Sequence, residues 1–334
     1  MSNVRMALIG CGGIQIRHAL SLRRRDEAEI VALGDVSPDQ LHQFAAHAHL
    51  AEDGPLPPMF TDLTKLYAQI RPDAVCIATP HTLHFEHGIQ ALEAGCHVLM
   101  EKPMVTDVDH AYRIAEKASQ AGTVFVIGFN TPCSPEFAYL RDLIRTQELG
   151  ELELVAGHLS QPWLKLTAGA WRQRPELSGG GQTYDSGAHI LNSLCWTVES
   201  RVAEVFAFVD NLGTPVDINA SINVRFENGV LASIIVGGNC PVSDAHMAYL
   251  FASGKVEVDP WNAAWINVYK GAERVKDPPI CRAPTGPVDN FLDAILGRAE
   301  PRTTPAAGVI HSELMDAIYE SARTGRPARP KNRS

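Results

Sequence analysis

The chain has 334 residues, which at about 150 residues per domain predicts two domains with sizeable cores. Apolar residues make up 45% and charged residues 20%, so the composition excludes a disordered or fibrous protein. The formal net charge of −9 disfavours general binding to nucleic acid, because an acidic surface repels phosphate backbones.

The first 130 residues alternate apolar runs of strand length with segments of helical periodicity. We expect strands at 4–9, 30–34, 74–78, 97–100 and 124–128, and helices at 16–25, 38–49, 84–94 and 108–120. Strands that alternate with helices through short connections predict a parallel, doubly wound sheet. We therefore assign residues 1–130 to one doubly wound α/β domain.

Residues 131–326 follow a different pattern, in which alternating, β-branched segments succeed one another through short turns. A helix is expected at 135–147, and strands at 152–159, 202–209, 218–226, 231–236, 248–251 and 266–269. Asn228-Gly229 between two of these strands is a strong hairpin signal. We predict a second α/β domain with a large, mostly antiparallel open sheet, one face of which is covered by helices at 186–196, 288–296 and 311–322. Residues 327–334 form a basic tail that we expect to be frayed.

Composition and spacing favour a cytoplasmic protein without a metal or a membrane partner. The seven cysteines lack a Cys-x-x-Cys pair, which disfavours a zinc site or a disulfide framework. No apolar run approaches the roughly 18 residues that span a bilayer, and the first strand leads into glycines rather than a signal peptide. His81, His84 and His87 have a spacing that invites a metal, but they straddle a strand end and a helix start, so their rings need not converge.

A glycine-rich loop, Gly10-Cys11-Gly12-Gly13-Ile14-Gln15, lies between the first strand and the first helix. The first glycine allows a tight turn, the second lets the backbone approach a pyrophosphate, and the helix start supplies N–H groups. Gln15 replaces the usual third glycine, so either the helix lies further from the strand or Gln15 donates to the cofactor. Asp35 ends the second strand, where an acid accepts from a ribose hydroxyl. No lysine or arginine follows Asp35 within 36–39, which favours NAD over NADP.

Two further groups of residues are candidates for catalysis. Lys102, in Glu101-Lys102-Pro103, follows a strand at the edge where doubly wound sheets bind ligands. It could polarise a substrate oxygen or be a surface lysine at a turn. Asp185 and His189 follow a run of glycines, and a helix beginning at Asp185 would place both on one face. They could supply a base and a group that orients it, or be a helix cap and a core histidine.

These motifs occur in one order between residues 4 and 326. They are Gly10–Gly13, Asp35, Ala78-Thr79-Pro80 with His84, Ala94–Val98, Glu101-Lys102-Pro103, Gly180-Gly181 with Asp185 and His189, and Tyr319–Gly325. Together they resemble the glucose–fructose oxidoreductase/inositol dehydrogenase (Gfo/Idh/MocA) family. The resemblance implies a Rossmann domain and a C-terminal α/β domain whose open sheet forms the contact in a homo-oligomer, a dimer or tetramer.

The resemblance also implies the residues of the site. It assigns catalysis to Lys102, Asp185 and His189, and it implies a cis Lys102–Pro103 bond. It implies cofactor contacts from Gly10, Gly12, Gly13, Ile14, Gln15, Asp35, Thr79, Pro80, His84, Glu101, Lys102, Asn130, Trp171 and Arg172. The chain departs from the family's pattern at Gln15, at Thr131-Pro132, where many members carry an arginine, and at Asn192, where an aspartate is frequent. The resemblance therefore names no particular sugar.

The activity that these expectations favour is NAD-dependent hydride transfer at a secondary hydroxyl or ketone of a sugar, polyol or sugar derivative. In it His189 exchanges the hydroxyl proton, Lys102 stabilises the alkoxide and Asp185 holds the substrate or tunes its neighbours. Two alternatives stay open. One is a redox-neutral glycosidase or lyase that uses bound NAD through a transient keto-sugar. The other is a non-catalytic, NAD-responsive binding protein.

Overall fold

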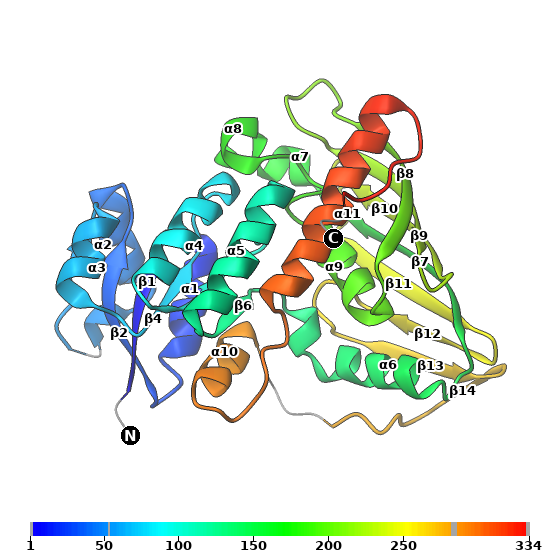
Figure 1. The fold of residues 1–334 in the computed structure, drawn as a ribbon, viewed down its shortest axis with the longest axis horizontal. Helices are drawn as coiled ribbons and strands as arrows, with labels where there is room; N and C mark the ends of the chain where they lie inside the picture. The colour runs from blue at the N-terminus through cyan, green and yellow to red at the C-terminus, as the bar shows by residue number, and fades with distance from the viewer. Residues whose placement is uncertain (1–2, 53, 282–285, 332–334) are drawn as a thin grey trace. The chain divides into compact units, whose positions relative to one another are not determined.

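The computed structural model describes residues 3–52, 54–281 and 286–331, and the chain divides into two compact units (Figure 1). The first unit holds the chain up to Val105, Asp109–Gly128 and Gly286–Pro305. The second unit holds Thr106–Val108, the described residues 129–281 and the chain from Ala306 onward. The crossing at Gly128–Phe129 lies close to the expected boundary at 130, but the return of 286–305 to the first unit means that no single boundary separates the two.

The first unit is built on a six-stranded sheet in which every described strand pair is parallel, with the order β3-β2-β1-β4-β5-β6. Its strands are β1 (Val4–Ile9), β2 (Ala28–Gly34), β3 (Met59–Phe60), β4 (Ala74–Ile77), β5 (His97–Met100) and β6 (Phe125–Ile127). Apolar residues fill the strands on both faces because helices lie on both sides. The predicted doubly wound Rossmann sheet is confirmed, and β3 is a short strand that the sequence did not reveal.

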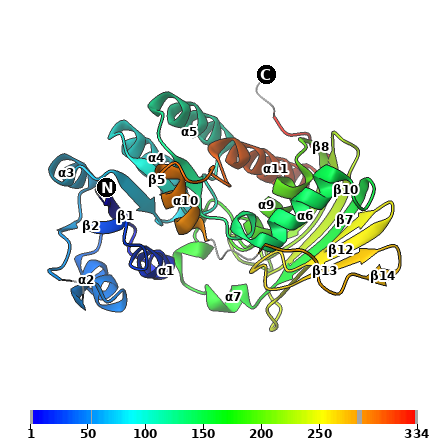
Figure 2. The same ribbon diagram turned by 90° about the horizontal axis from the view of Figure 1, so that it is seen from below.

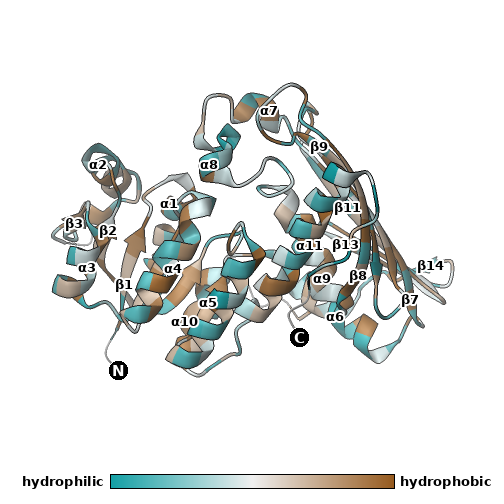
Figure 3. Ribbon diagram, turned by 45° about the horizontal axis from the view of Figure 1, so that its top comes forward, coloured by the Kyte–Doolittle hydropathy of each residue, from teal (hydrophilic) through white to brown (hydrophobic). Residues whose placement is uncertain are grey.

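Helices cover this sheet, and their polar faces point outward. They are α1 (Gly13–Leu22), α2 (Pro38–His47), α3 (Leu63–Ile70), α4 (His84–Glu93), α5 (Val108–Ala121) and α10 (Pro287–Ile295), with short 3-10 turns at Leu50–Glu52 and His81–Leu83. Ser37 caps α2 by accepting from the Gln40 N–H, and Pro38 occupies its first turn. In Figure 3, β1 is coloured as hydrophobic, whereas α4 and α5 show hydrophilic stretches.

The expected position of the helix at 288–296 is wrong. We predicted that residues 288–296 would cover the second sheet, but α10 packs in the first unit beside α1 and β5 (Figure 2). Val288, Phe291 and Leu292 are buried in the same core as Leu8 and Cys76. The amphipathic pattern of α10 predicts that one face is buried, but it carries no information on which sheet buries it.

The second unit contains an eight-stranded sheet with the order β14-β13-β12-β11-β7-β10-β9-β8. Its strands are β7 (Leu152–Ser160), β8 (Val202–Asp210), β9 (Asn219–Phe226), β10 (Leu231–Gly237), β11 (Asp244–Phe251), β12 (Gly254–Val258), β13 (Ile266–Lys270) and β14 (Glu273–Arg274). All pairs are antiparallel except β7 with β10, so the predicted mostly antiparallel sheet is confirmed. Asn228-Gly229 joins β9 to β10, as expected for a hairpin. Strands β12 and β14 were not predicted.

Helices α6 (Pro135–Thr146), α9 (Gly187–Val198) and α11 (Pro305–Thr324) share one apolar core with this sheet. Every residue of α9 is buried, which makes it the central helix of the unit. Shorter turns complete the unit: α7 (Trp163–Leu166), α8 (Pro175–Ser178), and 3-10 turns at Thr131–Cys133 and Trp171–Gln173. The opposite face of the sheet stays open and exposes apolar side chains, such as Phe208 (64% exposed) and Ile235 (55% exposed).

The C-terminal tail is partly ordered. Ala328 pairs with Val205 of β8 through two backbone hydrogen bonds of 2.8 Å, and Ala328 is buried. The expectation of a frayed tail is therefore wrong at this position, because the unpaired edge of β8 offers backbone donors and acceptors that the tail can satisfy. Residues 332–334 of the tail lie outside the described residues.

Candidate active site

The glycine loop of the first unit has the geometry of an anion-binding turn. Gly10 has a φ of +82°, and a Cβ there would lie 2.7 Å from backbone atoms of Ala78 and Thr79, so only glycine fits. A Cβ on Gly12 or Gly13 would meet nothing within 4 Å, so the space above the loop is open within this unit. Helix α1 begins at Gly13 with no side-chain cap and no acidic residue in its first turn. Its first N–H groups can therefore bind an anion such as a pyrophosphate.

Asp35 holds this loop from the end of β2. Its carboxylate accepts the N–H of Cys11 at 2.8 Å and that of Ser37 at 3.0 Å. Gln40 adds a bond from its side-chain amide to the Cys11 carbonyl at 2.6 Å. Burial and the Asp35 charge raise the pKa of Cys11 to about 12, so this thiol is a packing group and no nucleophile.

Gln15 lies beneath the loop, with its side chain turned into the unit. It is fully buried, its amide nitrogen donates to the Cys76 carbonyl of β4 at 2.9 Å, and the Cys76 thiol donates to its oxygen at 3.2 Å. The Gln15 side chain thus fills the space between α1 and β4. A glycine at this position would instead let the helix and the strand pack closely. Any contact of Gln15 with a cofactor would therefore involve its main chain.

Glu101 follows β5 and is tied to α1 by a residue that sequence reasoning missed. His18 on α1 donates from Nε2 to the Glu101 carboxylate at 2.7 Å, and both side chains are buried. Burial alone would raise the pKa of Glu101, but the hydrogen bond from His18, the charges of His18 and Lys102 and the Lys102 N–H hold it at about 2. Glu101 is therefore ionised, and it orients the backbone at Lys102. The sequence gives no signal for His18, which looks like any polar residue of an amphipathic helix.

The turn after Glu101 presents Lys102, which is half-buried. The Lys102–Pro103 bond is cis, as the family resemblance implied. The fully buried His84 ring joins this turn to the one after β4, with Nδ1 2.7 Å from the Pro103 carbonyl oxygen and Nε2 2.9 Å from the Thr79 carbonyl oxygen. Burial lowers the pKa of His84. Its ring supports the two turns, and both of its nitrogens are engaged with backbone.

The possible histidine metal site does not form. His87 uses Nδ1 for the Thr79 hydroxyl at 3.0 Å, while His84 faces two carbonyl groups. Within residues 3–52, 54–281 and 286–331, no group of three His, Cys, Asp or Glu residues is arranged to hold a metal ion.

In the second unit, Asp185 lies in the turn before α9 and not inside the helix. The helix start at Asp185 that would place both residues on one helix face is not found, because α9 begins at Gly187, one residue after the expected start at 186. The Asp185 carboxylate accepts from Trp163 Nε1 at 2.8 Å and from Arg172 Nε at 2.9 Å. Asp185 is thus a buried acceptor fixed by two donors, of which sequence reasoning missed Trp163. Arg172 in turn stacks on Trp171, at 4.5 Å from the ring centre.

His189 is in the first turn of α9 and is 8% exposed. The edge-on ring of Phe129 lies 6.1 Å away and the ring of Trp261 lies 6.5 Å away. Two of the departures from the family pattern belong to the same region: Asn192 is buried on α9, and the Thr131 hydroxyl is 2.8 Å from that of Ser193. Asn130, in contrast, is exposed.

Each unit therefore assembles part of the predicted set. The first unit gathers the glycine loop, Asp35, the Thr79 turn and Lys102 at the carboxyl ends of its strands. The second unit gathers Arg172, Asp185 and His189 around the start of α9.

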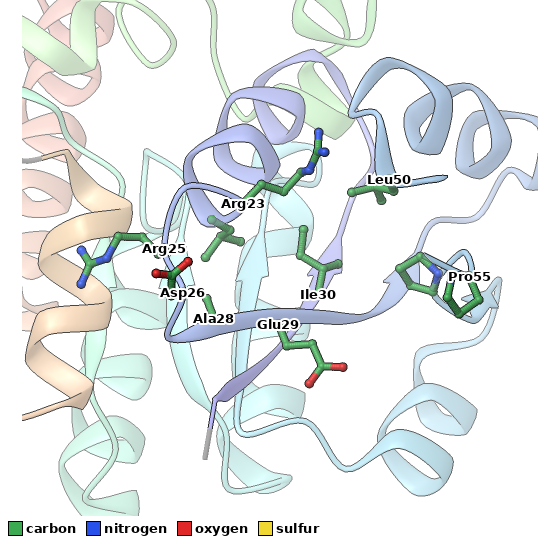
Figure 4. Close-up of a pocket in the computed structure, with 10 residues that line it drawn as sticks. Arg23, Arg25, Asp26, Ala28, Glu29, Ile30, Leu50 and Pro55 are labelled. Carbon is green, nitrogen blue, oxygen red and sulfur yellow. The ribbon is translucent and has the colours of Figure 1, made fainter. Parts of the chain in front are cut away.

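A pocket of about 370 Å³ lies elsewhere on the first unit (Figure 4). It is lined by Arg23, Arg25 and the first residues of β2, so it is at the opposite end of the strands from the glycine loop. Arg25 is neutralised by Glu27, Asp289 and Asp293. This pocket contains none of the predicted site residues, and its Arg25 is already paired.

Family models match most of the chain. Residues 4–129 match the NAD-binding Rossmann fold of the GFO/IDH/MocA oxidoreductases, and residues 137–256 match the GFO/IDH/MocA C-terminal domain. No helix in the part of the chain that the structure describes is long and apolar enough to cross a membrane.

Curated relatives include sugar dehydrogenases. D-glucoside 3-dehydrogenase from Escherichia coli (strain K12) is 29% identical over 198 residues, which cover 59% of this chain and only 54% of that enzyme. D-xylose 1-dehydrogenase [NADP(+)] from Haloarcula marismortui is 25% identical over 333 residues, which cover 96% of this chain and 91% of that enzyme.

Solved structures share the whole fold. The WlbA dehydrogenase from Bordetella pertussis, in complex with NADH and UDP-GlcNAcA, has a TM-score of 0.84 and 26% identity, and the match covers 99% of this chain and 100% of that one. Levoglucosan dehydrogenase, in complex with NADH and levoglucosan, has a TM-score of 0.86 at 19% identity, with 99% and 100% covered; at that identity it shows the fold alone.

Proposed function

Since this chain belongs to the GFO/IDH/MocA oxidoreductase family, we propose that it transfers a hydride between NAD and a secondary hydroxyl or ketone of a sugar, polyol or sugar derivative. The observation that carries the proposal is the start of α1, which has no side-chain cap and faces open space. It follows a tight loop in which position 10 has room only for glycine. This cradle fits a dinucleotide pyrophosphate.

We infer a preference for NAD over NADP from Asp35. Its carboxylate is fixed by the N–H groups of Cys11 and Ser37 at the end of β2, where it can accept from a ribose 2′-hydroxyl. A 2′-phosphate at that place would meet this negative charge, and residues 36–39 supply no lysine or arginine to offset it. We base this preference on the residues of this chain and not on its relatives, because one relative is named as NADP-dependent.

The proposed roles follow from the chemistry of three side chains. A bound nicotinamide supplies the hydride acceptor or donor. Lys102, next to the ionised Glu101, stabilises the alkoxide that forms as the substrate hydroxyl loses its proton. His189 takes or returns that proton. Asp185, whose carboxylate is fixed by Trp163 and Arg172, holds the substrate rather than moving the proton.

The open face of the second sheet supports the proposal of a homo-oligomer. Its outward side chains include Leu154, Phe208 and Ile235, which are 43%, 64% and 55% exposed in a single chain. An apolar patch of this kind on a sheet is typical of an interaction surface.

The test is to incubate the protein with NAD⁺ and a panel of sugars, polyols and glycosides, and to follow NADH and released aglycone together. Net NADH formation supports the dehydrogenase, whereas aglycone release without net NADH identifies the redox-neutral alternative. Lys102→Met and His189→Ala should each lower turnover by about 10³-fold or more and leave NADH binding intact. Normal turnover by both variants, or a wild-type protein that binds no nicotinamide dinucleotide, would refute the proposal.

A further inference from the structure

A buried aspartate outside the predicted set binds the glycine turn that precedes Asp185. Asp217, just before β9, is 3% exposed, and its two carboxylate oxygens accept the N–H groups of Gly181 at 2.5 Å and Thr183 at 2.8 Å. Its own carbonyl oxygen accepts the N–H of Gln182 at 2.9 Å. One residue therefore binds three consecutive N–H groups of the turn.

Tyr319 of α11 completes this arrangement. Its hydroxyl donates to the same Asp217 oxygen that binds Gly181, at 2.5 Å, and its ring stacks on Tyr184 with centroids 5.4 Å apart and planes 11° apart. Burial, with the charge of Asp217 close by, raises the pKa of Tyr319, so the hydroxyl keeps its proton and remains a donor. Together, Asp217 and Tyr319 connect the turn to β9 and α11.

These contacts explain sterically why the turn contains glycines. A Cβ on Gly181 would overlap backbone atoms of Asp217, and a Cβ on Gly180 would overlap the Tyr184 ring and the Tyr319 hydroxyl. Glycine is thus required at these positions because the turn packs closely against Asp217 and Tyr319, which we call the anchor. A loop that was merely flexible would not have this constraint.

The anchored turn determines where the proposed catalytic residues lie. The Gly181 carbonyl accepts the N–H of Asp185 at 3.0 Å, and the Gln182 carbonyl accepts that of Gly187, the first residue of α9, at 2.8 Å. We propose that Asp217 and Tyr319 are positioning residues that fix Asp185 and, through the start of α9, His189. This inference rests on the proposed function, in which Asp185 and His189 act on the substrate. Misplacement of reacting groups by about 1 Å can lower a rate by about 10²-fold, so such an anchor affects catalysis without touching the substrate.

A purely structural role makes a different prediction. It would lower stability and affect turnover no more than any other lost hydrogen bond in the same core. Tyr249→Phe is the matched control, because Tyr249 is a buried tyrosine of the same unit whose hydroxyl lies 3.0 Å from that of Thr197 and does not contact the turn. It loses the same atom as Tyr319→Phe.

The experiment compares Tyr319→Phe, Asp217→Asn and Tyr249→Phe in the full chain. Amide hydrogen exchange of the turn should accelerate by about tenfold or more in the first two variants and should not change in the control. Asp217→Asn removes the charge and one acceptor oxygen from the N–H groups of Gly181 and Thr183. Tyr319→Phe removes the donor that holds the Asp217 carboxylate in place for them. With the substrate identified by the panel above, kcat should fall about tenfold in Tyr319→Phe and up to about 10²-fold in Asp217→Asn. The Kd for NADH, measured by fluorescence titration, should stay within twofold of the wild-type value in all three.

Two results would overturn the inference: unchanged exchange of the turn in both anchor variants, or a loss of kcat no larger than in Tyr249→Phe. If Asp217→Asn fails to fold, Tyr319→Phe decides, since it removes a single hydroxyl and keeps the ring. A wild-type protein that turns over no substrate refutes the proposed function, and the positioning role with it. Wild-type turnover with variants that match the control refutes the positioning role alone.

Discussion

Replacing Glu101 with glutamine should destabilise the first unit by about 3 kcal/mol at pH 7. The pKa of Glu101 in the folded chain is about 2, against an ordinary value of 4.5, because its bonds to His18 and the Lys102 N–H, with the nearby positive charges, outweigh the effect of burial. At about 1.4 kcal/mol for each pH unit between the two values, the ionised carboxylate contributes about 3 kcal/mol. Glutamine keeps the shape of the side chain and removes its charge.

The pH dependence has a definite sign. Since folding lowers this pKa, the stabilisation is complete above the unfolded value of 4.5 and is lost as the pH falls through the folded value of about 2. The difference between wild type and Glu101→Gln should therefore shrink from about 3 kcal/mol at pH 7 to about 1 kcal/mol at pH 3.

The assay must report on the first unit by itself. All five tryptophans lie in the second unit, so their fluorescence follows the wrong core. Peptide-resolved amide exchange of β1 and β4 in a urea series, corrected for the pH dependence of the intrinsic rate, gives the stability of the first unit. Glu93→Gln is the control, because Glu93 is exposed on α4 and its loss should cost no more than about 0.5 kcal/mol. A cost below about 1 kcal/mol for Glu101→Gln at pH 7, or the same cost at both pH values, would show that the ion pair does not stabilise this unit as reasoned.

Two further substitutions test the proposed roles in each unit. Asp35→Asn should weaken NADH binding by about tenfold and reduce the preference for NADH over NADPH, because it removes the carboxylate proposed to accept from the ribose and to repel a 2′-phosphate. Titration with both dinucleotides measures the two Kd values. An unchanged ratio between them would contradict the proposed role. Trp163→Phe removes one donor to the Asp185 carboxylate and leaves the one from Arg172, so kcat should fall about tenfold while NADH binding is preserved. Equal losses in both quantities would instead indicate general unfolding.

Local patterns in the sequence were sufficient for the first sheet and for the position of the glycine loop. Continuous apolar runs predicted β1, β4 and β5 within a residue, since a parallel strand buried on both faces can be identified from its own residues. The loop from Gly10 and the acid at Asp35 were found in the same way, because the chemistry of a helix start depends on neighbours in the chain. The parallel direction of the strands also followed, because strands that alternate with helices through short connections run in the same direction in a sheet.

The sequence by itself could not decide which distant segments would meet. Helix α10 packs on the first sheet although it follows the second in the chain, and β7 pairs in parallel with β10 inside an otherwise antiparallel sheet. The amphipathic pattern of a helix predicts only that one face is buried, and the alternation in a strand predicts only which side chains share a face. Neither pattern identifies the packing partner, which is therefore decided in the folded chain.

The same limit applies to the candidate site. Lys102, Asp185 and His189 could be singled out from spacing and motif, but the groups that fix their surroundings could not. His18 and Glu101 are 83 residues apart, and Trp163 and Asp185 are 22 apart. Hydrogen bonds between such residues leave no periodicity in the sequence, because they depend on two chain segments arriving at the same place. Sequence therefore determined which chemical groups this protein carries, and tertiary structure determined which of them are held rigid, ionised and oriented.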